Sequence, residues 1–135
     1  MAAQLPLEEV IHVAEFRAAL RRFMRRTERI AQSSGLTPQR YLLLLMIKGA
    51  PDGTGRSTVT ELSERLQLAQ STVTELVRRA EQARLVEREQ SSTDARVAYL
   101  RLTEEGERRL ARAFTDLGSE RAALRAAIVQ FAGER

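Results

Sequence analysis

The amino-acid sequence predicts a mainly α-helical α+β fold of the winged helix-turn-helix type, with about six helices and a small β-hairpin wing. Three observations predict it. Apolar residues recur at helical spacing through most of the chain, a tight turn separates two short helical stretches after Thr58, and the period changes to two after Leu85. A helix-turn-helix followed by a hairpin is therefore expected between Thr58 and Leu102.

Two short amphipathic stretches form the expected helix-turn-helix. Thr58 and Glu61 have the spacing of a capping box, in which each side chain satisfies a backbone N–H, so a helix should begin at Val59. Both stretches carry an apolar stripe that lets the helices cross over a shared core. The stripe residues are Leu62, Leu66, Val73, Leu76 and Val77.

The second of these helices leaves a polar face outside its apolar stripe. Hydroxyl and amide side chains near a helix start can hydrogen-bond base edges in the major groove, and arginines further along suit phosphates. We therefore predict that this face binds DNA. Its candidate contact residues are Gln70, Ser71, Thr72, Thr74, Arg78 and Arg79, with Glu75 among them on the same face.

A β-hairpin is expected after the second helix. Its strands are the runs Val86–Glu89 and Val97–Leu102, and the loop QSSTDA between them is closed by Arg96. A loop that carries a cation at its base can reach a minor groove or a backbone beside the helix. Arg88 of the first strand is a further candidate DNA contact.

These segments resemble the MarR-type (multiple-antibiotic-resistance-regulator) winged-helix transcription factors. The matching pieces are LTPQRYLLL from Leu36, TVTELSERL and STVTELVRRAEQARLVER, the Asp94-Ala95-Arg96 signature, and LTEEGERRL from Leu102. The resemblance implies that Arg96 enters a minor groove and that Asp94 orients it.

The sequence departs from the pattern of these regulators at two positions. Gln67 stands where the turn usually has Gly, and Ala69 stands where it usually has Ser. Ser71 is then an alternative cap one turn later, which would shorten the second helix.

Composition argues against an enzyme and against a membrane partner. The chain is 43% hydrophobic and 30% charged, which is typical of one globular domain, and it has no run near the roughly 20 apolar residues that span a bilayer. It has no cysteine, and His12 is its single histidine, so we expect no metal site, cofactor or nucleophile–base pair. The start MAAQLPLEEV lacks a signal-peptide pattern, and a cytoplasmic location is expected.

The net charge of +4 fits a nucleic-acid partner but is weak evidence alone. The excess of basic over acidic residues lies outside the predicted helix-turn-helix and hairpin. Nine basic and five acidic residues precede Thr58, whereas Thr58–Leu102 carries seven of each. The DNA prediction therefore rests on where individual arginines point.

Both ends of the chain are expected to be amphipathic helices. Leu7–Ser33 reads as one helix, longer than a small winged domain needs, so we expect its ends to pack on a second copy of the chain. Its arginines are interpreted as a solvated face, with direct DNA contact as the alternative. They are Arg17, Arg21, Arg22, Arg25, Arg26 and Arg29.

The remaining helices follow from caps and breakers. Thr37-Pro38 should start a largely buried helix through Ile47, and Thr103 should cap another helix with Leu110 and Phe114 on its inner side. A break near Gly118-Ser119 precedes a last helix over Glu120–Ala132. We therefore divide the chain into a helical dimerisation region, residues 1–34 and 103–135, and a DNA-binding lobe, residues 36–102.

These observations predict a homodimeric DNA-binding transcriptional regulator, most simply a repressor of an inverted-repeat operator, with double-stranded DNA and a second copy as partners. The resemblance implies release by a small aromatic or phenolic ligand between the two regions. By position, its pocket residues are Phe16, Arg17, Tyr41 and Leu45, although each also fits plain core or surface roles. The alternatives are a protein-interaction module without DNA binding and a peripheral membrane protein that uses the Arg-rich first helix.

Overall fold

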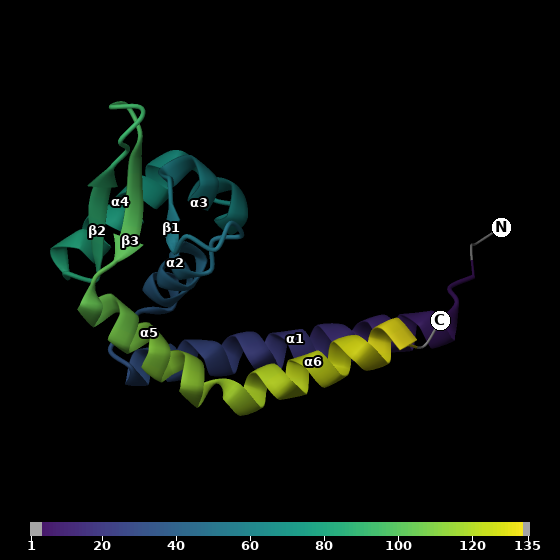
Figure 1. The fold of residues 1–135 in the computed structure, drawn as a ribbon. Coiled ribbons are helices and arrows are strands. Elements are labelled where there is room, and N and C mark those ends of the chain that lie inside the picture. Colours follow the sequence, from purple (N-terminus) through teal and green to yellow (C-terminus); the bar gives the residue numbers. More distant parts are fainter. Residues whose placement is uncertain (1–3, 134–135) are drawn as a thin grey trace.

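The computed structural model describes residues 4–133, which form a winged lobe and a two-helix arm (Figure 1). In chain order the helices are α1 (Leu7–Ser33), α2 (Pro38–Lys48), α3 (Val59–Leu66), α4 (Gln70–Gln82), α5 (Glu104–Asp116) and α6 (Gly118–Gly133). The strands are β1 (Arg56–Ser57), β2 (Val86–Gln90) and β3 (Ala98–Leu102). The winged helix-turn-helix fold predicted from the sequence is thus confirmed.

Side-chain caps fix where α2, α3 and α5 begin. The Thr37 hydroxyl accepts the Arg40 N–H at 3.1 Å ahead of Pro38, and the Thr103 hydroxyl accepts the Gly106 N–H at 3.0 Å. Thr58 and Glu61 form the predicted capping box at the start of α3. These short polar caps leave the helix interiors free for apolar packing.

The core lies in the lobe, around the apolar helix α2. Tyr41, Leu43, Leu44 and Ile47 of α2 are buried, and the inner residues of α3, α4 and β3 close over them. The adjacent end of the arm joins this core through α1 and α5. Helix α1 contributes Ala31, and α5 with its C-cap contributes Leu110, Ala113 and Leu117.

The sheet is antiparallel and has the order β1-β3-β2. The pairs Val86–Leu102 and Arg88–Leu100 set the hairpin register, which places Leu100 and Leu102 on the buried face. The third strand, β1, was not predicted. It has only two residues, which is too short to show a period of two, and it pairs with β3 through Ser57 opposite Leu100.

One predicted core position on α5 is wrong. Phe114 is 45% exposed, whereas Ala113 and Leu117 are fully buried. In a helix, residues three and four positions after Leu110 both lie on nearly the same face as Leu110. Here the inner position is taken by the smaller residue, Ala113. The Phe114 ring instead lies under the Arg121 guanidinium, 3.6 Å from Cζ to the ring centroid.

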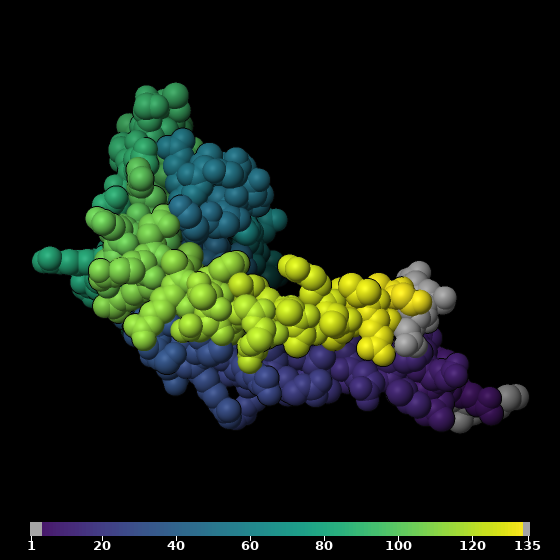
Figure 2. Space-filling model, turned by 60° about the horizontal axis from the view of Figure 1, so that its bottom comes forward, coloured from purple at the N-terminus to yellow at the C-terminus, as the bar shows by residue number. Residues whose placement is uncertain are grey.

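Helices α1 and α6 lie along each other and form the arm, which extends away from the lobe (Figures 1 and 2). The rings of Phe16 and Phe131 are in contact, with centroids 4.9 Å apart, and Arg26 pairs with Glu120 at 3.2 Å. Helix α6 has no buried residue, and α1 buries only Ala31 among its described residues. The arm therefore leaves much of its apolar surface uncovered.

Candidate nucleic-acid interface

The turn between α3 and α4 is tight even though it contains no glycine. Gln67 adopts the left-handed conformation that usually favours glycine, with φ of 56°. Its side-chain amide donates to the Glu64 carbonyl at 2.6 Å, the Leu68 N–H donates to the Ser63 carbonyl at 3.1 Å, and the Ser63 hydroxyl donates to the Leu68 carbonyl at 2.6 Å. Local hydrogen bonds thus hold the strained turn.

Helix α4 begins at Gln70, and no side chain caps its start. The alternative that Ser71 caps the helix one turn later is therefore wrong, since Ser71 lies inside the first turn and Ala69 occupies the cap position. The Gln70 amide donates instead to the Thr60 hydroxyl of α3 at 3.3 Å. The first N–H groups of α4 consequently have no side-chain cap within residues 4–133.

One face of α4 is buried and the opposite face is exposed to solvent. Val73, Val77 and Ala80 are fully buried, and Leu76 is nearly so. All six candidate contact residues on α4 are exposed on the other side, as the sequence predicted from the stripe. They are Gln70, Ser71, Thr72, Thr74, Arg78 and Arg79.

The two arginines of this face share one carboxylate. Arg78 donates to both oxygens of Glu75, from Nη2 at 2.5 Å and from Nε at 2.9 Å, and Arg79 Nε donates at 3.1 Å. The hydrogen bonds from Arg78, and then those from Arg79, lower the pKa of Glu75 to about 2. Glu75 is therefore ionised at any physiological pH.

The wing loop ends in an exposed guanidinium that an aspartate orients. The Asp94 carboxylate accepts the Arg96 backbone N–H at 3.0 Å and its Nε at 3.3 Å, and these bonds lower the pKa of Asp94. The loop is closed further by the Ser91 hydroxyl, which accepts the Thr93 and Asp94 N–H groups, and by Gln90. The Arg96 side chain nevertheless remains 90% exposed.

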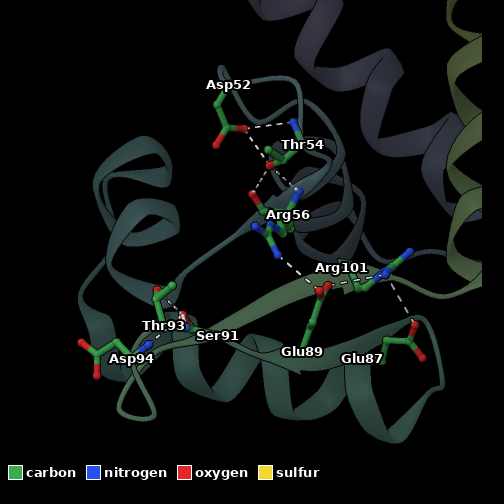
Figure 3. A network of polar contacts seen from close by, with 9 residues as sticks. All are labelled: Asp52, Thr54, Arg56, Glu87, Glu89, Ser91, Thr93, Asp94 and Arg101. Carbon is green, nitrogen blue, oxygen red and sulfur yellow. Dashed lines mark hydrogen bonds and ion pairs between the residues drawn. The ribbon is translucent and has the colours of Figure 1, made fainter.

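The base of the wing is braced on both faces of the sheet. On the outer face, Arg56 and Arg101 pair with Glu89 at 3.2 and 3.4 Å (Figure 3). Arg56 also stacks over the Tyr99 ring. On the inner face, Arg88 Nε donates to Glu81 of α4 at 3.0 Å. The hairpin is thus tied to β1 and to α4.

One of the four pocket residues expected between the two regions lines a hollow on the arm. Phe16 lines a hollow between α1 and α6, whereas Arg17, Tyr41 and Leu45 do not line it. Tyr41 is only 4% exposed, and burial raises the pKa of its hydroxyl, an effect that the Arg121 charge partly offsets. The hollow is lined instead by His12, Glu15, Phe16, Ala19, Arg22, Ala127, Gln130 and Phe131.

Other kinds of site find no support in the part of the chain described. Residues 4–133 hold no group of three or more His, Asp or Glu side chains placed to ligate a metal ion. No helix among them combines the length and the apolar character that a membrane crossing requires.

The second helix of the helix-turn-helix exposes a polar face, and the hairpin that follows it exposes an arginine in its loop. This arrangement defines the class of winged helix-turn-helix regulators. The family model described as MarR family matches residues 34–97. YsmB, an HTH-type transcriptional regulator of Bacillus subtilis, is 34% identical over 107 residues, covering 76% of this chain and 68% of YsmB. The chain belongs to the MarR family, whose members are transcriptional regulators and not enzymes.

Solved structures agree with this assignment. A MarR family protein from Bacillus stearothermophilus is 28% identical to this chain and superposes with a TM-score of 0.74. The match covers 88% of this chain and 81% of the Bacillus stearothermophilus protein. Sco3205, a MarR family transcriptional regulator from Streptomyces coelicolor solved in complex with DNA, is 25% identical, with a TM-score of 0.67 over 96% of this chain and 79% of its own.

Proposed function

We propose that the chain forms a homodimeric cytoplasmic repressor that binds an inverted-repeat operator and is released by a small ligand. The observation that carries this proposal is the pair of exposed polar elements on one lobe, the bare start of α4 and the Arg96 wing. Residues 36–102 would form the DNA-binding lobe, and residues 1–34 and 103–135 the dimerisation region. The likeness to Sco3205, which was solved with DNA, supports the choice of partner.

The proposed contacts divide by the chemistry of their side chains. Gln70, Ser71, Thr72 and Thr74 carry short donors and acceptors at the start of α4, where a recognition helix meets base edges in a major groove. The cations would hold the backbone or enter the minor groove, with Asp94 orienting the last of them. They are Arg78, Arg79, Arg88 and Arg96.

A second copy of the chain is the proposed occupant of the apolar surface of the arm. Helix α1 has 27 residues and is about 40 Å long, and large aliphatic or aromatic side chains stay exposed on both arm helices. A free monomer rarely exposes so many together, and a two-fold pairing of identical arms would cover them. The exposed residues are Leu7, Val10, Ile11, Val13, Met24, Ile128, Val129 and Phe131.

Ligand control would work through the separation of the two lobes of the dimer. A ligand that binds equally well to dimers with either lobe spacing does not shift the equilibrium between them. An inducer must therefore bind more tightly to the dimer whose lobes cannot enter two successive major grooves. The hollow beside Phe16 lies on the arm that would set this spacing. An aromatic ligand at that place would contact both Phe16 and Phe131.

The second candidate, a protein-interaction module, is favoured only by the uncovered apolar arm. A salt titration of binding to a mixed-sequence duplex separates the two functions. If a dimer neutralises about eight phosphates, the logarithm of its affinity should fall against the logarithm of salt concentration with a slope near −7. If the protein shows no salt-dependent binding to the duplex over the whole titration, DNA binding is ruled out and the interaction module is favoured.

A further inference from the structure

Glu75 lies at the centre of the exposed face of α4. Residues three and four positions apart on a helix are neighbours, and Glu75 has this spacing to Ser71, Thr72, Arg78 and Arg79. Its side chain is 43% exposed, so it is reachable by a ligand on that face. A carboxylate thus stands among the residues proposed to meet DNA.

The ion pairs of Glu75 lower the net positive charge that α4 presents to a ligand. Arg78 and Arg79 remain 54% and 59% exposed while both donate to Glu75, so the three side chains carry a net charge of +1 where the arginines alone would carry +2. The pairing is local to one helix and needs no partner element. It therefore requires only that α4 is folded.

We propose that Glu75 is a specificity-determining residue, an internal counterion that suppresses sequence-independent DNA binding through α4. The inference rests on the proposed function. Because phosphates must compete with a carboxylate already bound to both guanidinium groups, each subunit gains less from the DNA backbone alone.

Base edges also respond to this carboxylate. In the major groove a carboxylate can accept hydrogen bonds from the amino groups of cytosine and adenine, and it is repelled by the acceptor atoms of guanine and thymine. A mismatched sequence then offers Glu75 no donor and leaves it beside phosphates. Such a repulsive element improves discrimination between partners at the expense of total affinity.

The test compares the Glu75→Gln variant with the parent protein on two duplexes, one of mixed sequence and one selected from a random pool by the parent. On mixed-sequence DNA at about 0.1 M salt, the variant should bind at least about tenfold more tightly. Its salt slope should be steeper by about 2 per dimer, since each further phosphate neutralised adds roughly 0.9. Affinity for the selected duplex should rise less, so the ratio of the two affinities falls.

Two controls separate the ion pairs from the loss of a charge. Glu64→Gln removes the same charge from an exposed position of the lobe whose carboxylate makes no ion pair within residues 4–133, and it should change mixed-sequence affinity much less. In an Arg78→Ala, Arg79→Ala background, Glu75→Gln should have no larger effect than Glu64→Gln. Thermal unfolding of each variant checks that the fold is retained.

The outcomes distinguish this inference from the function on which it rests. If the parent binds DNA with a steep salt slope but Glu75→Gln matches the parent or Glu64→Gln, the role of Glu75 is refuted and the proposed function stands. An equal gain in the background without the two arginines refutes it too. If the parent does not bind mixed-sequence DNA and selects no duplex from the pool, both proposals fail.

Discussion

Replacement of Arg96 by alanine should weaken binding to a selected operator by at least about tenfold while leaving the fold intact. A guanidinium contact to DNA contributes roughly 1 to 3 kcal/mol, and a dimer would lose one such contact from each wing. The fold should not respond, because the Arg96 side chain is 90% exposed and, among residues 4–133, bonds only to Asp94, two residues away. Fluorescence anisotropy at constant salt measures the first quantity, and thermal unfolding the second.

The matched control for this result is Arg108→Ala on α5. Arg108 is also highly exposed and paired with a nearby acid, Glu105, but it lies outside the proposed DNA-binding lobe. The variant therefore removes one charge per chain without touching the wing. Equal affinities for parent and Arg96→Ala would show that the wing does not contact DNA, and an equal loss in Arg108→Ala would show a general charge effect.

Replacement of Gly106 by alanine should lower the free energy of unfolding by about 3 kcal/mol and the Tm by roughly 10 °C. A Cβ at this position would lie 2.1 Å from the Leu85 carbonyl oxygen, which is backbone and already accepts the Thr103 N–H at 3.0 Å. The start of α5 would have to move away from Leu85, the residue before β2. Unfolding curves recorded at one protein concentration measure the effect.

Gly118→Ala is the control for this substitution. The nearest atom to a Cβ at Gly118 is the end of the flexible Arg121 side chain, at 3.9 Å, so no backbone has to move. Alanine is also the better helix former, by up to about 1 kcal/mol. If Gly106→Ala were as stable as Gly118→Ala, the close approach of α5 to Leu85 would be wrong.

Most of the fold could be predicted because its signals are local. The capping box at Thr58 and the Thr37-Pro38 start each depend on residues within one turn of helix, and the structure reproduces both. Strand β1 could not be predicted, since its two residues become a strand only by pairing with β3. Phe114 has the helical spacing of four from Leu110 that predicts an inner position, but the smaller Ala113 packs there.

The candidate site divides in the same way. The exposed face of α4 follows from its apolar stripe, and the ion pairs of Glu75 with Arg78 and Arg79 could have been found from their spacing of three and four residues. The pairs that brace the wing join residues far apart in sequence, such as Arg56 and Glu89. Nothing in the local sequence indicates which of the charged residues meet across elements.

The central claim is that two identical lobes bind the two halves of one palindrome, and the mass of the protein–DNA complex tests it most directly. Duplexes selected from a random pool by the parent protein would be sequenced and then sedimented with it. We expect an inverted repeat whose half-sites lie about 10 to 10.5 base pairs apart, or a multiple of this, and two chains on each duplex. A single chain per duplex, or selected sequences without two-fold symmetry, would contradict the claim.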